Sequence, residues 1–222
     1  MKSDLGKRET KARLGKILAV LEKSYPAAET CLLFETPLQI LVATILSAQC
    51  TDERVNRLTP ALFRKYPSAE AFAAADRAEL EKDIRPTGFF RNKAKSIQGA
   101  AQKIVAEFGG RVPETMAELI TLPGVARKTA NIVLSSAFHK AEGIAVDVHV
   151  ARLSQRMGLT KQSVPEKIEQ NLLALVPTKY WLTFNYMLVN HGRAVCQSRK
   201  PRCSECRLRD LCPRIGVPAP KT

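Results

Sequence analysis

Lys128 is predicted to lie in the first turn of a helix, a position that favours a nucleophilic amine. Pro123 and Gly124 follow a short helical run from Met116 to Ile120, and they end it because proline removes a backbone donor and glycine permits positive φ. A second helix is predicted to begin near Arg127, which places Lys128 in its first turn, where the helix dipole disfavours a cation. Such an amine loses its proton more easily than a surface lysine, and a neutral amine can form a Schiff base.

An acid further along the chain could assist that amine. Asp147 lies between Val146 and Val148, inside an apolar run. A simpler alternative stays open at this point, because charged groups are usually surface groups. In that alternative Lys128 is one solvated base among the 35 Lys and Arg residues, and Asp147 only caps a helix.

The same turn, together with the net charge, favours a polyanionic partner. Two helices joined by a tight glycine turn leave backbone N–H groups unpaired, and a helix start of this kind attracts phosphate. Lys and Arg number 35 against 21 Asp and Glu, a net charge of +14, which suits nucleic acid. An anionic membrane would also suit this charge, but no basic amphipathic stretch supports it. The longest apolar run, Ile40 to Leu46, is too short to span a bilayer.

Four cysteines near the C-terminal end have the spacing of a metal site. They are Cys196, Cys203, Cys206 and Cys212, in the pattern C-x6-C-x2-C-x5-C. The N-terminus is polar with no apolar segment behind it, so we expect a cytosolic protein without a secretory signal, in which metal binding is favoured over disulfides. From spacing alone, zinc and an iron–sulfur cluster are both compatible with four thiolates.

The elements that must position these residues are all predicted to be helices. A helix is expected from about Glu9 to Tyr25, after a frayed polar segment of residues 1–8. Pro37 is expected to begin a nearly all-buried helix that ends at a polar break, residues 47–52. The fold class predicted from this pattern is all-α.

A pair of aromatic residues follows the break at Pro86 to Gly88. Phe89 and Phe90 stand beside Arg91, Lys93 and Lys95, a pattern that stacks bases and holds phosphates. The alternative is that both rings are core residues. We expect Phe89 to face outward and Phe90 to pack inward.

Two segments resemble the helix-hairpin-helix motif of the endonuclease III family of DNA glycosylases. They are residues 122–131, LPGVARKTAN, and residues 145–149, AVDVH. The resemblance implies that Lys128 attacks C1′ of a deoxyribose with the assistance of Asp147, and that the DNA-contacting residues include Gly124, Ala126, Arg127 and His149. Ala126 departs from the family, which usually has a second glycine there. A methyl group is acceptable only if that residue keeps negative φ.

Further segments extend the resemblance to about residues 10–213. Residues 46–52, LSAQCTD, resemble a segment whose glutamine, here Gln49, enters the gap left by a flipped base, and the loop with Phe89 would supply a wedge on the opposite strand. The cysteine spacing is that of one [4Fe–4S] cluster in the family. It implies Cys196, Cys203, Cys206 and Cys212 as ligands, and we expect Lys200 and Arg202 in its basic loop to contact phosphates.

As a whole, the resemblance implies a two-lobed all-α glycosylase fold. A six-helix barrel would occupy residues 30–140, with the helix-hairpin-helix at about 114–138, and a [4Fe–4S] cluster lobe would combine residues 1–29 and 141–222. The implied activity is a bifunctional DNA glycosylase with AP lyase activity on oxidised pyrimidines. We expect a monomer that acts on damaged or abasic double-stranded DNA at the nucleoid, with no membrane partner.

Three other functions compete with this interpretation. An adenine-mismatch glycosylase without lyase activity would carry a small or hydroxyl residue at position 128, an acid in place of residues 43–45, and a further C-terminal domain. A non-catalytic DNA-binding module would need neither Lys128 nor Asp147. A zinc-stapled nucleic-acid-binding protein would contain no iron.

Overall fold

The computed structural model describes the backbone of residues 2–217 and the side chains from Arg8 onwards. Over this range the chain forms helices and no β-strand, so the predicted all-α class is confirmed. Among the described helices, none combines the length and the apolar character that crossing a bilayer requires. The helices are α1 (Lys2–Ser24), α2 (Pro37–Leu46), α3 (Asp52–Lys65), α4 (Ala69–Ala73), α5 (Arg77–Ile84), η1 (Arg85–Thr87), α6 (Phe90–Phe108), α7 (Met116–Leu119), α8 (Arg127–Ala137), α9 (Val148–Arg156), α10 (Pro165–Leu175), η2 (Thr178–Tyr180) and α11 (Phe184–Ala194).

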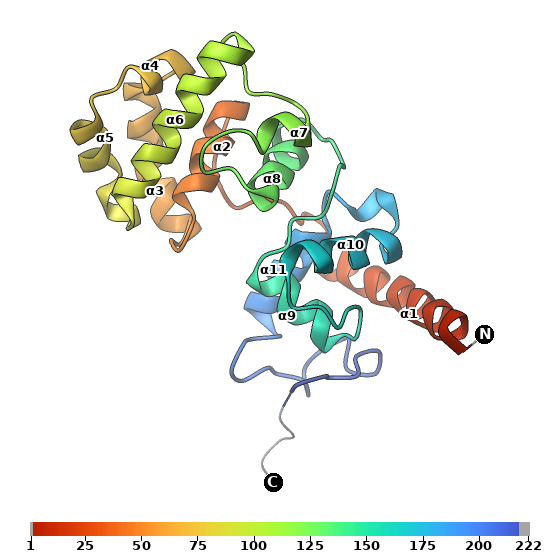
Figure 1. Ribbon diagram of the computed structural model, residues 1–222. Coiled ribbons are helices and arrows are strands. Elements are labelled where there is room, and N and C mark those ends of the chain that lie inside the picture. Colours follow the sequence, from red (N-terminus) through yellow and green to blue (C-terminus); the bar gives the residue numbers. More distant parts are fainter. Residues whose placement is uncertain (1, 218–222) are drawn as a thin grey trace. The chain divides into compact units, whose positions relative to one another are not determined.

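The chain folds into two compact units (Figure 1). The middle unit is residues 30–142, and the terminal unit combines residues 1–29 with residues 143–222. Each unit has a hydrophobic core of its own, as expected for separately packed parts of one chain.

The middle unit is organised around α2. Pro37 opens this helix, and the hydroxyl of Thr36 caps it by accepting a hydrogen bond from Gln39 N at 3.2 Å. All side chains from Ile40 to Leu46 are buried, and α3, α6 and α8 pack around them. Because α2 has no polar face, it must lie inside the unit, and the polar turn after Leu46 carries the chain back to the surface.

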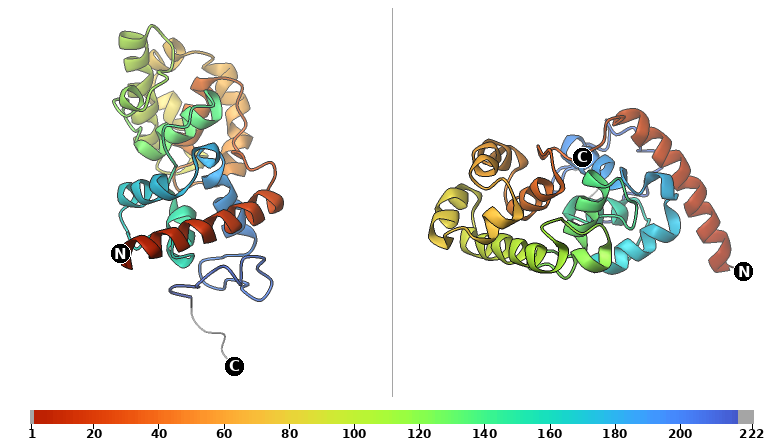
Figure 2. Two further views of the ribbon diagram at one scale, coloured as in Figure 1. Left: turned by 90° about the vertical axis from the view of Figure 1, so that its right-hand side faces the viewer. Right: turned by 90° about the horizontal axis from the view of Figure 1, so that it is seen from above.

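The terminal unit packs α1 against α11, and α11 against α9. Leu14, Ile17, Leu18 and Leu21 form the predicted apolar face of α1, and each is at most 1% exposed. The helix begins at Lys2, earlier than the start predicted at about Glu9, so residues 2–8 are helical rather than frayed; Met1 lies outside the described residues. No proline interrupts residues 2–8, and the helix therefore continues through them; Figure 2 shows α1 as one long element.

Candidate functional site

The turn between α7 and α8 requires glycine at position 124 for two reasons. Gly124 has a φ of +77°, in the region that favours glycine. A Cβ atom at this position would also lie 2.5 Å from Cβ of Ser96 on α6. The turn is closed by a hydrogen bond from Val125 N to Leu122 O of 3.1 Å. The hairpin is therefore held tightly against α6.

Ala126, the departure from the family pattern, is accommodated by its backbone. It has φ −94° and ψ 171°, so the condition of negative φ is met and a methyl group is tolerated. Ala126 is the N-cap residue of α8, and its side chain makes no capping hydrogen bond. Hydroxyl or carboxylate side chains cap α2, α3, α4, α5, α7 and α9, whereas α6, α10 and α11 begin without one, as α8 does. The start of α8 is thus free of a capping side chain, an arrangement that suits an external anion.

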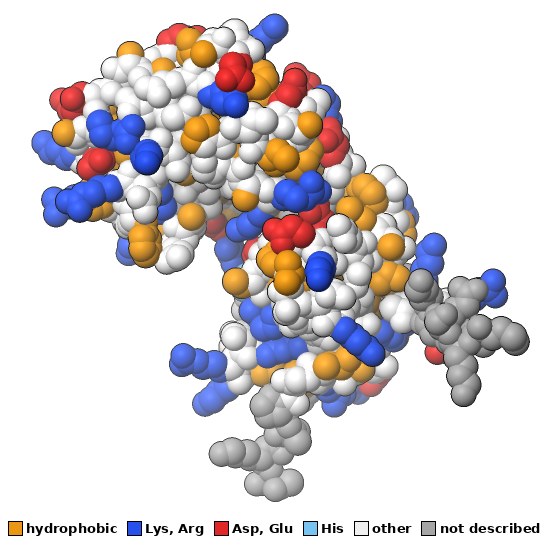
Figure 3. Space-filling model, in the orientation of Figure 1, with side chains coloured by type: hydrophobic (Ala, Val, Ile, Leu, Met, Phe, Trp, Pro, Cys, Tyr) orange, Lys and Arg blue, Asp and Glu red, His pale blue; other side chains and the backbone are white. Residues whose placement is uncertain are grey.

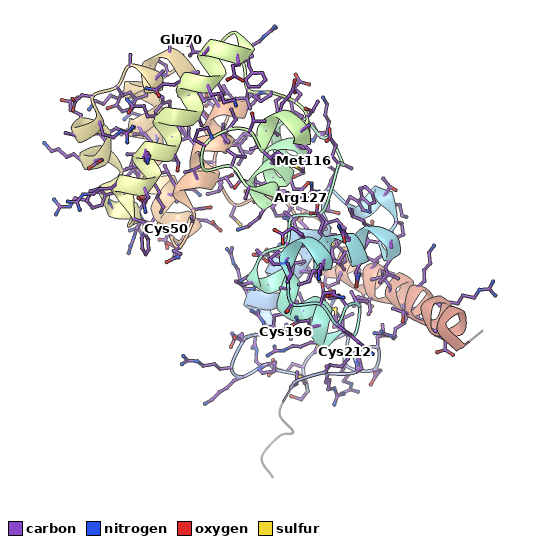
Figure 4. The ribbon with its side chains drawn as sticks, viewed as in Figure 1. Cys50, Glu70, Met116, Arg127, Cys196 and Cys212 are labelled. Carbon is purple, nitrogen blue, oxygen red and sulfur yellow. The ribbon has the colours of Figure 1, made fainter. Side chains whose placement is uncertain are left out.

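Lys128 lies in the first turn of α8 and is exposed. Ala130, Val133 and Leu134 are buried, and they fix the helix against the core so that its opposite face points to solvent. Arg127, the residue before the lysine, is half-buried at the N-terminal end of the helix (Figure 4). The amine of Lys128 is therefore exposed on a helix that is packed against the core, close to a helix start without a capping side chain.

Asp147 caps α9 in the terminal unit. Its Oδ1 accepts hydrogen bonds of 2.8 Å from both His149 N and Val150 N, as the simpler alternative predicted. The residue is half-buried. Its Oδ1 is engaged in capping the helix. His149 is held through Nδ1, which lies 3.1 Å from Nη2 of Arg152.

Gln49 and Phe89 both adopt left-handed backbone conformations, with φ values of +53° and +47°. Holding a non-glycine residue there costs roughly 1–3 kcal/mol, and such strain clusters at functional sites. Gln49 is exposed in the turn between α2 and α3. Phe89 precedes α6 and is 63% exposed. Both side chains therefore project from strained turns of the middle unit.

Phe90 has the inward orientation predicted for it. Its ring packs against the core of the middle unit, and the guanidinium groups of Arg85 and Arg91 lie 5.9 and 5.5 Å from the ring centroid. These distances are within the range of cation–π interactions. Of the two adjacent rings, only Phe89 is exposed enough to meet a ligand.

Lys93 differs from the prediction. The sequence placed it with Arg91 and Lys95 in a pattern that holds phosphates, but it is 4% exposed. Its Nζ donates hydrogen bonds to Leu46 O at 2.7 Å and to Thr87 O at 2.8 Å. Burial lowers the pKa of Lys93, and the nearby thiol of Cys50 acts in the opposite direction. The signal that could have predicted this burial is helical spacing, because Lys93 follows Phe90 by three positions and so falls on the buried face of α6.

The four predicted metal-binding cysteines line one common cavity of the terminal unit; Figure 4 labels Cys196 and Cys212. Within residues 2–217, no three His, Cys, Asp or Glu side chains converge closely enough to hold a single metal ion. Burial is the main cause that raises the pKa of Cys206 and Cys212, and the neighbouring thiols raise it further. The four thiols therefore share one cavity.

Two buried side chains adjoin this cavity with hydrogen-bonding groups. Arg156 Nη1 lies 3.3 Å from Cys196 Sγ, and His191 Nε2 lies 3.5 Å from Cys206 Sγ. Burial lowers the pKa of His191 to about 4, so the imidazole is neutral near pH 7. Its Nδ1 lies 3.2 Å from the hydroxyl of Tyr25. The thiols are thus provided with donors that would stabilise bound thiolates.

The loop between Cys196 and Cys203 carries the two basic residues expected to meet phosphate. Lys200 is exposed. Arg202 is also exposed, but it binds Ala194 O through Nη2, and its Nη1 lies 3.3 Å from the carboxylate of Glu205. Lys and Arg side chains gather over this loop in the space-filling view (Figure 3). Arg202 therefore holds the loop in shape, while Lys200 extends into solvent.

Comparison with known proteins identifies the family. A profile described as the HhH-GPD superfamily base excision DNA repair protein matches residues 42–178. The chain is 60% identical over 203 residues to the endonuclease III of Synechocystis sp., covering 91% of this chain and 93% of that protein. It is 46% identical over 190 residues to the endonuclease III of Bacillus subtilis, covering 85% and 86%.

The fold agrees with these relatives. A solved structure described as a trapped endonuclease III–DNA covalent intermediate superimposes with a TM-score of 0.87 and 38% identity, covering 92% of this chain and 96% of that one. The predicted glycosylase fold is therefore confirmed. The chain belongs to the endonuclease III family within the HhH-GPD superfamily of base excision DNA repair proteins.

Proposed function

We propose that this protein is a bifunctional DNA glycosylase and AP lyase that removes oxidised pyrimidines from duplex DNA, with Lys128 as the nucleophile. The observation that carries the proposal is the exposed amine of Lys128 in the first turn of α8, directly after the glycine turn. It is supported by the likeness to an endonuclease III that was trapped as a covalent intermediate with DNA. A non-catalytic DNA-binding module would need neither Lys128 nor Asp147 for chemistry, and an incision assay on a lesion duplex separates the two functions.

Duplex DNA is held mainly through its phosphates. A phosphate of the DNA backbone binds at the turn formed by Gly124 and Ala126, next to the uncapped start of α8. Arg127 adds a positive charge there. Lys200 contacts the duplex from the cysteine loop, and Arg202 keeps that loop in shape. A monomer is sufficient for these contacts. The substrate places the protein at the nucleoid, in the cytosol.

The damaged base is extruded from the stack before it is cut. Extrusion costs a few kcal/mol, and it costs least for a damaged base because its stacking and pairing are weakened. Gln49 enters the gap that the base leaves, and Phe89 wedges into the opposite strand. Both residues project from backbone conformations that are fixed before DNA binds, which reduces the ordering cost on binding.

The chemistry then runs through Lys128. The neutral amine attacks C1′ of the deoxyribose, and the bond between C1′ and the base nitrogen breaks, so that the base leaves with the electron pair and takes up a proton. Opening of the sugar ring gives a protonated Schiff base, which acidifies the C2′ proton. Loss of that proton expels the 3′ phosphate oxygen by β-elimination, and water releases the lysine.

Asp147 supports this step while it caps α9. The charged carboxylate stabilises the positive charge that develops on the sugar, or accepts the proton that the lysine must lose. Two backbone N–H donors at Oδ1 hold the carboxylate in a fixed orientation. His149 follows it in the first turn of α9 and contacts the DNA backbone.

We propose a [4Fe–4S] cluster as the group that the four cysteines hold. A four-iron cluster takes one thiolate at each iron. The proposal is supported by the cysteine spacing, which resembles that of the family, and by the cavity that the four cysteines line together. When bound, the cluster supplies a rigid, redox-capable centre, and we assign it a structural role in shaping the basic loop.

Replacing the nucleophile should separate binding from chemistry. Lys128→Ala should retain lesion-DNA binding but lose the borohydride-trapped protein–DNA adduct, with strand cleavage falling by more than about a thousandfold. Gel analysis of the trapped adduct measures this. Lys82→Ala, which removes an equally exposed lysine of the middle unit, is the control and should trap normally. An undiminished trapped band in Lys128→Ala would exclude Lys128.

The two roles of Asp147 can be separated by matched substitutions. Asp147→Ala removes the cap and should lower the free energy of unfolding by about 1 kcal/mol. Asp147→Asn keeps an oxygen acceptor at the cap, so its stability should stay near that of the wild type. Both variants should lose about a hundredfold or more in base release, because both lose the charge. If Asp147→Asn cleaves at the wild-type rate, the residue is only a cap.

The cluster assignment predicts the metal content. Purified protein should contain iron and acid-labile sulfide, and no stoichiometric zinc, with visible absorbance from thiolate-bound iron. Cys203→Ser should lose that absorbance, while Cys31→Ser, which changes an exposed cysteine outside the motif, should keep it. Stoichiometric zinc without sulfide would contradict the assignment.

A further inference from the structure

Lys93 joins two segments that are distant in sequence. Its ammonium group binds the carbonyl of Leu46, the last residue of α2, and that of Thr87, the last residue of η1. Both carbonyls belong to helix ends, where the partial negative charge favours a cation. One side chain thus connects the ends of two helices in the middle unit.

The two bonded carbonyls immediately precede the two strained turns. Leu46 stands three positions before Gln49, and Thr87 stands two positions before Phe89. Outside glycine, positive φ angles in the described middle unit occur only at Gln49, Phe89 and His139. The carbonyl contacts of Lys93 therefore lie next to the two strained residues that have exposed side chains at these turns.

The environment of Lys93 is unusual for a lysine. The side chain is 4% exposed, and no carboxylate in the described residues pairs with it, since its recorded hydrogen bonds go to the two carbonyls. Burying a charge without an acid partner is unfavourable, and an apolar residue of similar size would pack there at less cost. An apolar residue, however, could not donate hydrogen bonds to the carbonyls of Leu46 and Thr87. Connecting the two turns is therefore the property that only this lysine provides.

We infer that Lys93 is a positioning residue that clamps the Gln49 turn and the Phe89 turn at a fixed spacing, so that both side chains enter the duplex together. The inference rests on the proposed function for its consequence in DNA, but the clamp itself is a property of the free protein. Lys93 touches no reacting atom and acts through the two turns.

The clamp should matter for base extrusion more than for cleavage at an abasic site. An intact lesion must be unstacked and its gap filled, which requires both inserted side chains. An abasic site has no base to extrude, and the reaction there depends chiefly on the amine of Lys128. Misplacing a positioning group by about 1 Å can cost around a hundredfold in rate.

The clamp can be tested without DNA by hydrogen exchange. Lys93→Met replaces the side chain with an apolar one of similar length and leaves both carbonyls unpaired. Peptides covering residues 47–51 and 87–92 should exchange at least about tenfold faster, while the hairpin at residues 121–126 should be unchanged. Lys103→Met on the same helix breaks only a surface pair with Glu107 of 3.5 Å and is the matched control. If Lys93→Met does not fold, Lys93→Gln, which keeps a shorter donor, takes its place with the same expected pattern.

Enzyme assays then test the consequence. Lys93→Met should release a lesion base about ten- to a hundredfold more slowly than the wild type, while cleavage of a pre-formed abasic site should stay within a few-fold. Lys103→Met should leave both rates unchanged. An equal loss in both reactions, or faster exchange throughout the protein, would mean that Lys93 only stabilises the fold. Unchanged exchange at both turns would overturn the clamp, whereas absence of base release by the wild type would refute only the proposed function.

Discussion

The first turn of α8 combines two features that are unfavourable in isolation. Its N-cap residue, Ala126, offers no side-chain acceptor for the helix N–H groups, and a lysine lies at the positive end of the helix dipole. Both features would become favourable under the proposed function, in which a phosphate binds at this turn and the amine acts as a nucleophile. Gly124 fixes this geometry, because its left-handed backbone and its approach to Ser96 leave no room for a side chain.

The remaining site residues likewise combine a structural task with the chemical one proposed for them. Asp147 ends the preceding loop by capping α9 through Oδ1. Gln49 and Phe89 form tight turns while exposing their side chains. Arg202 stabilises the loop that carries Lys200. Positioning by tightly bonded backbone reduces the ordering that must accompany DNA binding.

Most of the fold could be predicted from sequence because its signals are local. The helix start predicted at Pro37 is where α2 begins. The same kind of local signal marks three other helix starts, because Thr51 and Asp76 are capping residues and Pro165 opens α10. The extent of α1 was underestimated because polar residues were taken as frayed, although nothing there breaks a helix.

Local signals could not determine how distant turns are joined. The left-handed backbones of Gln49 and Phe89 depend on tertiary contacts, since neither residue type prefers that region. Lys93 was grouped with Arg91 and Lys95 in a pattern that holds phosphates, but its side chain is buried in the middle unit. The motif spacing was enough to predict the family from the sequence. The hydrogen bonds of Lys93 could be seen only in the structure.

The account rests on a covalent bond between Lys128 and the sugar, and peptide mapping tests that bond most directly. Wild-type protein reduced with borohydride on lesion-containing DNA would be digested with protease and nuclease and analysed by tandem mass spectrometry. The account predicts that the mass of the reduced sugar adduct is on the peptide containing Lys128. A modification on another lysine, or on the N-terminal amine, would contradict it.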